Sequence, residues 1–180
     1  MRVIGLAGWS GAGKTTLLAK LIPELTGRGL SVSTLKHAHH AFDIDQPGKD
    51  SHTHRQAGAT EVLISSGRRY ALIHELRDEA EPQLRDLLQR LSAVDLVLVE
   101  GFKRSGHPKI EVHRAANGRP FLFPELSSIV ALASDAELPD ALHLPALQLD
   151  DVPAIAEAVL AHALPLAETL ARLSSDPVPA

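Results

Sequence analysis

The chain has 180 residues, a formal net charge of −4 and no cysteine. Its length suits one α/β domain and is short for two, and the lack of cysteine excludes disulfides and thiolate metal sites. The negative charge and an aromatic content of only 3% argue against nucleic acid as a partner. No stretch reaches the ~20 consecutive apolar residues of a membrane span, and no signal peptide fits, so we expect a cytoplasmic protein. We expect one domain over residues 1–173 and a flexible tail over residues 174–180.

The first predicted elements are a buried strand over residues 3–7 and an amphipathic helix that starts at Thr15 and ends near Gly27. Pro23 should kink this helix or loosen one of its turns. Between the strand and the helix lies Gly-Trp-Ser-Gly-Ala-Gly-Lys-Thr, residues 8–15, which fits the pattern G-x-x-x-x-G-K-[ST] without a mismatch.

A strand, a glycine-rich loop and a helix in this order form the context that a phosphate-binding loop requires. Glycines allow the backbone N–H groups to point at an anion, and the helix N-terminus adds a partial positive charge. We predict that Lys14 contacts the β/γ-phosphates of a nucleotide and that the Thr15 hydroxyl binds Mg²⁺. The predicted nucleotide-binding residues of the loop are Ser10, Gly11, Ala12, Gly13, Lys14 and Thr15.

A second strand, over residues 30–35, brings Lys36 and His37 to the end of the sheet. A strand–helix–strand unit of this kind must be parallel and right-handed. The polar segment that follows is rich in histidine, with His37, His39, His40, His52 and His54. It also carries further charged residues, namely Asp43, Asp45, Lys49, Asp50 and Arg55.

This segment has three interpretations. It could be a switch loop around the phosphates, in which the lysines and Arg55 supply positive charge and an aspartate binds Mg²⁺ or water. It could hold a transition metal through imidazole ligands, or it could be a solvated loop that happens to be rich in histidine. We prefer the phosphate-side interpretation, because the segment leaves its strand beside the predicted phosphate loop.

The remaining predicted elements alternate between strands and helices. They are a short helix capped by Ser51 that runs through residues 56–57, a hairpin of residues 60–65 and 70–74, a helix over 82–91, a strand over 94–99, a second hairpin of residues 110–114 and 121–123 around Asn117-Gly118, strands over 128–133 and 146–149, and a helix from residue 152 into the 160s that Pro165 kinks or divides. This order predicts an α/β fold of the P-loop NTPase type, with a doubly wound, mainly parallel sheet and antiparallel hairpin additions.

Two acidic residues flank the strand over residues 94–99. Asp95 lies at its start and Glu100 at its end, roughly 16 Å apart at ~3.3 Å per residue. Phosphate sites lie at the carboxyl ends of parallel strands, so Glu100 is the candidate metal ligand and, with Lys14, the candidate catalytic residue. Asp135 follows the later strand over residues 128–133 and could accept hydrogen bonds from N1–H and N2–H of guanine, which makes it the candidate reader of the base.

Five stretches of the chain form a more specific signature. They are residues 8–16, K-H-x-H-H-x-F-D-x-D-x-P-G-K-D-S over residues 36–51, R-x-A-G-A over residues 55–59, L-V-E-G-F-K over residues 98–103 and K-I-E-V over residues 109–112. In this order they resemble the MobB family, the molybdopterin-guanine dinucleotide biosynthesis adaptor proteins, and the resemblance covers roughly residues 1–135.

The resemblance implies a homodimeric P-loop protein that binds GTP with Mg²⁺ and hydrolyses it weakly. Such a protein assists the MobA guanylyltransferase in attaching GMP to molybdopterin, which makes molybdopterin a candidate bound substrate. The positions that match the family for phosphate, metal and the Walker-B role are Gly11, Gly13, Lys14, Thr15, Thr16 and Glu100. In the family the His/Asp loop lies near the nucleotide, which does not by itself give each residue a role. The phosphate-side interpretation makes Lys36 and His37 candidate nucleotide-binding residues and Asp43 and Asp45 candidate metal ligands.

Three other functions stay open. A P-loop kinase for a small molecule would need a pair of lid arginines and an acidic residue that binds the acceptor. A metallochaperone GTPase would use the histidine loop for Ni²⁺ or Zn²⁺, and a nucleotide-gated adaptor would show no meaningful turnover. No arginine finger is obvious from the sequence, and Arg55 and Arg104 are the candidates for that role.

Overall fold

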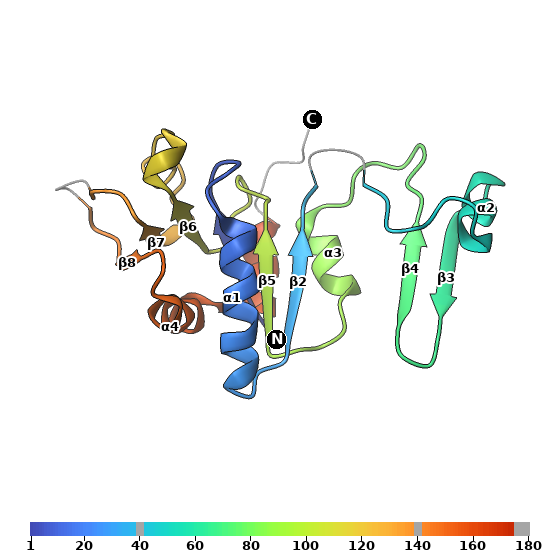
Figure 1. Cartoon of the computed structure of the whole chain (residues 1–180), viewed down its shortest axis with the longest axis horizontal. Helices are drawn as coiled ribbons and strands as arrows, with labels where there is room; N and C mark the ends of the chain where they lie inside the picture. The colour runs from blue at the N-terminus through green and yellow to red at the C-terminus, as the bar shows by residue number, and fades with distance from the viewer. Residues whose placement is uncertain (39–41, 139–141, 175–180) are drawn as a thin grey trace. The chain divides into compact units, whose positions relative to one another are not determined.

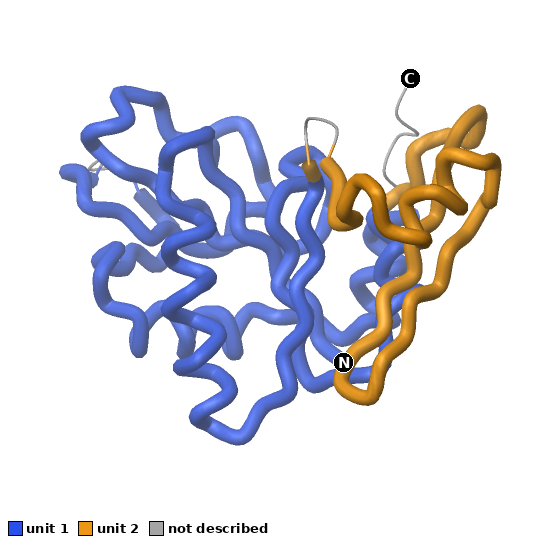
Figure 2. Tube along the Cα trace, turned by 45° about the vertical axis from the view of Figure 1, so that its right-hand side comes forward, with its two compact units in different colours: residues 1–37, 84–180 blue, residues 38–83 orange. Residues whose placement is uncertain are grey.

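The computed structural model describes residues 1–38, 42–138 and 142–174. The chain forms two compact units, of which unit 1 comprises Met1–His37 and Leu84–Ala180 and unit 2 comprises Ala38–Gln83 (Figure 2). His39, His40 and all of the predicted tail except Ser174 lie outside the described residues. Within the described ranges, no helix is both long and apolar enough to cross a membrane.

Unit 1 is built on a seven-stranded sheet with the order β2-β5-β1-β6-β7-β8. All the pairings along this order are parallel, and β9 adds one antiparallel pairing to the start of β1. The strands are β1 (Arg2–Ala7), β2 (Val32–Lys36), β5 (Leu96–Glu100), β6 (Lys109–His113), β7 (Ile129–Ser134), β8 (Ala146–Gln148) and β9 (Leu164–Pro165). The mainly parallel, doubly wound α/β architecture that the sequence predicts is therefore confirmed.

Helices cover both faces of this sheet (Figure 1). The helices of unit 1 are α1 (Lys14–Gly27), α3 (Leu84–Arg90), α4 (Val152–His162) and α5 (Leu166–Leu173). Residues such as Ile4 and Leu98 point to one face and pack with α1 and α4, whereas Val3 and Val97 point to the other face and pack with α3 and α5. The near-continuous apolar run of β5 follows from burial on both faces.

Pro165 divides the last helical segment, as the sequence predicts. It lies in β9, which pairs with Arg2 and Val3 of β1, and α5 begins at the next residue. The Arg2 side chain also donates hydrogen bonds to the carbonyl oxygens of Leu160 and Ala163 at the end of α4. Proline suits this position because it cannot continue a helix and needs no backbone donor at the edge of a sheet.

Unit 2 contains α2 (Asp50–Gln56) and the antiparallel hairpin of β3 (Glu61–Ser65) and β4 (Tyr70–His74). The hairpin confirms the sequence prediction. The predicted cap of the short helix is wrong, because the residue at the N-cap is Lys49. Ser51 lies inside the first turn, where its hydroxyl donates to Asp45 Oδ1 at 2.7 Å.

The predicted second hairpin is also wrong. β6 runs parallel to β1 on one side and to β7 on the other, and a short 3-10 helix over Ala115–Asn117 follows it. Residues 121–123 form no strand. The buried Glu111 carboxylate accepts the backbone N–H groups of Leu122 and Phe123 at 2.7 and 2.9 Å. These donors are therefore paired with a side chain instead of a neighbouring strand.

The connection from β5 to β6 passes directly over β1. Gly5 donates its N–H to Pro108 O at 2.8 Å, and a Cβ atom at Gly5 would lie 2.5 Å from His107 Nε2. Only glycine allows this approach. Lys109 is also fully buried, and its ammonium group donates to the carbonyl oxygens of Ser105 and His107.

His107 is fully buried, and neither of its ring nitrogens has a hydrogen-bond partner among the described residues. Burial, with a smaller contribution from the nearby Lys109 charge, lowers the pKa of His107 well below its ordinary value. The imidazole is therefore neutral in the folded chain near neutral pH.

We expect the free energy of unfolding to fall in acid because of His107. Unfolded, the imidazole regains a pKa of about 6.5, so the unfolded chain takes up a proton that the folded chain does not. The stability present at neutral pH is then lost progressively as the pH falls from about 6.5 towards the lower pKa of the folded state, by on the order of 1 kcal/mol per pH unit. Urea unfolding near neutral pH and near pH ~5.5 measures this loss.

Two variants test whether His107 causes the loss of stability in acid. His107→Leu should flatten the pH dependence, and His143→Gln, which changes an exposed histidine, should leave it as in the wild type. Equal pH dependence in the wild type and in His107→Leu would contradict the assignment.

Candidate functional site

The loop between β1 and α1 has the backbone of an anion-binding turn. Gly8, Gly11 and Gly13 have positive φ values of 149°, 80° and 95°. A side chain at Gly8 would overlap the Val112 carbonyl oxygen of the neighbouring β6. The loop then enters α1 at Lys14, so the N-terminus of a 14-residue helix lies at the loop. This arrangement suits the phosphates of a nucleotide.

Lys14 folds back over the loop. Its ammonium group donates to Gly8 O and Trp9 O, both at 3.0 Å. Partial burial lowers the pKa of Lys14, the Glu100 carboxylate opposes that shift, and Lys103 and Lys36 add to it. The Lys14 ammonium therefore has one carboxylate and two further ammonium groups near it, and an anion bound at the loop would offset the charge of these cations.

Glu100 lies at the carboxyl end of β5, beside the loop, as the sequence predicts. Its buried carboxylate accepts a hydrogen bond from Thr15 Oγ1 at 3.2 Å, and Lys36 Nζ lies 3.8 Å from its Oε2 atom. Asp95 lies at the opposite end of the strand, where it accepts the N–H and the hydroxyl of Ser31. A carboxylate and a threonine hydroxyl side by side are the hard oxygen donors that Mg²⁺ prefers, so these residues fit that ion.

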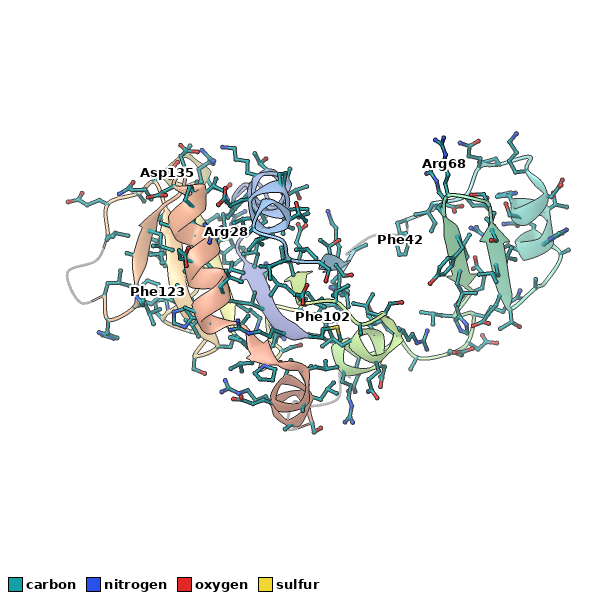
Figure 3. All side chains as sticks on the ribbon, turned by 90° about the horizontal axis from the view of Figure 1, so that it is seen from below. Arg28, Phe42, Arg68, Phe102, Phe123 and Asp135 are labelled. Atoms are coloured by element: carbon teal, nitrogen blue, oxygen red, sulfur yellow. The ribbon has the colours of Figure 1, made fainter. Side chains whose placement is uncertain are left out.

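The backbone after Glu100 is tightly constrained. Gly101 has a φ of 100°, and a Cβ atom there would lie 2.7 Å from the Cβ of His37. Phe102, labelled in Figure 3, also has a positive φ of 48°, which is rare for an aromatic residue. The His37 ring packs against the Phe102 ring with centroids 4.7 Å apart, and the His37 N–H donates to Glu100 O at 2.9 Å. β2 thus delivers Lys36 and His37 next to Glu100.

Two further residues, which no sequence pattern predicted, tie the loop to the segment after β6. Asn117 Nδ2 donates to Ser10 O at 2.9 Å, and Trp9 Nε1 donates to Pro120 O at 2.8 Å. Lys103 and Arg119 lie over the Trp9 ring, 4.8 and 5.6 Å from its centroid. Asn117-Gly118 had been predicted as a hairpin turn, so these contacts with the loop were not expected. Pro120 lies between the two predicted strands of that hairpin, so its missing N–H was no argument against the strand ladder.

Asp135, labelled in Figure 3, follows β7 and contacts the turn after β6. Its Oδ1 atom accepts the Ala115 N–H at 2.7 Å, and its Oδ2 atom lies 3.3 Å from Arg114 Nη1. The Arg114 guanidinium in turn lies over Gly13, because its Nη2 atom is 3.4 Å from the position of a Cβ on that residue. The reading of guanine by Asp135 stays a prediction.

The two aspartates proposed as metal ligands belong to unit 2. Arg55 binds Asp43 through two nitrogen–oxygen contacts of 2.8 and 3.0 Å, and it also lies 3.7 Å from Asp45 and 2.9 Å from Glu75. The hydrogen bonds from Arg55 and from the backbone of Asp45 lower the pKa of Asp43. Arg55, one of the two candidate arginine fingers, is thus engaged with carboxylates of its own unit. In the part of the chain that the structure describes, no group of three or more His, Asp or Glu side chains is arranged to hold a metal ion.

Comparisons with known proteins identify the family of this chain. The family model of molybdopterin guanine dinucleotide synthesis protein B, MobB, matches residues 3–135. The molybdopterin-guanine dinucleotide biosynthesis adapter protein of Escherichia coli K12 is 43% identical over 88% of this chain and 91% of its own length. The adapter protein of the same name from Haemophilus influenzae Rd is 39% identical over 86% of this chain and 85% of its own length. A crystal structure of molybdopterin-guanine biosynthesis protein B superposes with a TM-score of 0.66 at 28% identity and covers 88% of this chain and 98% of that one. The chain therefore belongs to the MobB family.

Proposed function

We propose that this protein binds GTP with Mg²⁺ and acts as an adapter in molybdopterin guanine dinucleotide biosynthesis. One observation carries the nucleotide part of the proposal. The Glu100 carboxylate contacts the Thr15 hydroxyl beside a glycine-rich loop that ends in Lys14. A metal-binding pair and an anion-binding loop at one edge of a parallel sheet form the arrangement that holds a nucleoside triphosphate.

Different residues of the site would bind the phosphates and the metal ion. The loop N–H groups and the N-terminus of α1 would hold the phosphates, and Lys14 would leave its two carbonyl partners to neutralise the charge of the β/γ-phosphates. Thr15 and Glu100 would hold Mg²⁺, which supplies charge stabilisation at the phosphates when it is bound. Weak GTP hydrolysis would follow from this positioning.

The adapter role comes from the relatives. Proteins that match most of the chain are named molybdopterin-guanine dinucleotide biosynthesis adapter proteins. The partner that fits this role is a MobA-type guanylyltransferase, with molybdopterin as a candidate ligand. GTP binding would then make the association of the two proteins dependent on the nucleotide.

A homodimer is part of the same proposal. In unit 2, β3 and β4 pair only with each other within the described residues, and a lone two-stranded sheet is marginally stable in water. The hairpin exposes large apolar side chains, namely Leu63 (64%), Ile64 (41%), Tyr70 (70%) and Leu72 (54%). A second copy of the chain would cover this surface and stabilise the hairpin.

Lys14→Ala should bind GTP about 10- to 100-fold more weakly than the wild type, because it loses charge-assisted hydrogen bonds to the phosphates. Isothermal titration calorimetry with GTP and Mg²⁺ measures this loss. The matched control is Lys20→Ala on the same helix, whose ammonium group is exposed and 3.4 Å from Asp150. Unchanged GTP binding by Lys14→Ala would refute the phosphate-loop assignment.

The adapter role predicts an effect on the transferase partner. We expect the wild-type chain to increase the amount of guanine dinucleotide cofactor that a MobA-type enzyme forms from molybdopterin and GTP, and Lys14→Ala to give a much smaller increase. Single-turnover GTP hydrolysis, with and without the transferase, separates a true GTPase from a nucleotide-gated adapter. Equal stimulation by the two chains would show that nucleotide binding at this loop is not needed for the role.

The dimer predicts a change of mass in solution. Leu63→Asp combined with Leu72→Asp should lower the mass measured by light scattering from that of two chains to that of one, because the two side chains are register partners on the exposed hairpin. Gln89→Asp, at an exposed position of α3, is the control for added charge. A dimer that persists in the double variant would exclude this hairpin as the contact.

A further inference from the structure

We propose that Arg114 contacts the α-phosphate of the bound nucleotide and that Asp135 positions its guanidinium group. The inference rests on the nucleotide binding proposed above, and it assigns one specific phosphate contact to Arg114. Arg114 is the first residue after β6, which pairs with β1 on the side opposite β5.

The guanidinium group lies over the phosphate loop. Its Nη2 and Nε atoms are 3.4 and 3.7 Å from the position that a Cβ atom would take on Gly13. Gly13 immediately precedes Lys14, where α1 begins, so its neighbourhood carries the partial positive charge of a helix N-terminus. Such a position is unfavourable for a cation alone; the Asp135 carboxylate, 3.3 Å from Arg114 Nη1, offsets part of this charge, and a phosphate at the loop would offset more. A guanidinium group held there therefore suits a phosphate ligand.

The order of the strands indicates which phosphate is involved. Thr15 and Glu100 mark the metal side of the loop, and Glu100 comes from β5. These two residues would hold a metal ion, which would supply positive charge at the terminal phosphates when it is bound. The α-phosphate and the nucleoside then lie on the other side of β1, towards β6 and β7. Arg114 and Asp135 stand at the ends of those two strands.

Asp135 and Asn117 hold this side of the site in place. Asp135 uses one oxygen for Arg114 and the other for the Ala115 N–H, while Asn117 ties the same turn to Ser10 O. The Arg114 side chain remains 40% exposed, so a ligand can reach it. A guanidinium group that is already oriented loses little conformational freedom on binding. An isolated surface ion pair would contribute little to stability.

The test compares GTP, GDP and GMP, which all carry an α-phosphate. Binding is measured by displacement of a fluorescent GTP analogue from the wild type and from Arg114→Ala, Arg114→Lys and the control Arg172→Ala. We expect Arg114→Ala to weaken all three nucleotides by a similar factor of roughly tenfold, and Arg114→Lys to restore part of the loss. Lys14→Ala should instead weaken GTP and GDP far more than GMP, and Arg172→Ala, on α5, should change nothing.

Nucleotide binding by Asp135→Asn tests whether Asp135 positions the Arg114 guanidinium group. Asp135→Asn should weaken GTP and ATP by the same factor, and it should add no further loss to Arg114→Ala, because both changes remove one contact. A loss confined to GTP would assign Asp135 to the guanine base and overturn the positioning role. Thermal unfolding shows that each variant is folded before its binding is compared.

Three results overturn the inference. If Arg114→Ala binds all three nucleotides as the wild type does, Arg114 and Asp135 form only a surface ion pair. If the loss is confined to GTP, the guanidinium group contacts the γ-phosphate. In either case the nucleotide-binding function stands. A wild-type chain that binds none of the three nucleotides overturns the proposed function and this inference with it.

Discussion

Parallel pairing of β1 with β5 on one side and with β6 on the other determines what surrounds the glycine-rich loop. Each strand ends at the same edge of the sheet and brings its last residues to the loop. β5 contributes Glu100 and β6 contributes Arg114, so a carboxylate lies on one side of the loop and a guanidinium group on the other. This asymmetry gives the candidate site a direction, with the Glu100 carboxylate at one end and the Arg114 guanidinium at the other.

Keeping β6 in that position requires unusual residues in the interior. The crossover from β5 passes so close to β1 that only glycine fits at position 5, and His107 is buried against it as a neutral ring without hydrogen-bond partners in the described part of the chain. Burial also raises the pKa of Glu111, although its carboxylate accepts two backbone N–H groups that hold the next segment in place. Stability in the centre of the sheet and the geometry of the site therefore depend on the same strand.

Elements that depend on interactions between residues near each other in the sequence were predicted more accurately than elements that depend on distant pairing partners. The strand before the loop, the helix after it and the strand that ends at Glu100 were predicted correctly because hydrophobic periodicity and burial act over a few residues. The hairpin around Asn117-Gly118 was wrong because a local turn pattern competed with pairing partners far away in the chain. β6 pairs with β1 and β7, and Gly118 instead follows a 3-10 turn.

The amino-acid sequence by itself determined the phosphate-loop motif, the choice of Glu100 over Asp95 and the family, because these depend on residue types at fixed spacing and on strand polarity. Only the tertiary structure decided that Asn117 and Trp9 anchor the loop and that Asp135 orients Arg114 over Gly13. These contacts join segments about 20 to more than 100 residues apart, and no local pattern encodes such separations. They exist because the parallel sheet brings the carboxyl ends of its strands to one edge.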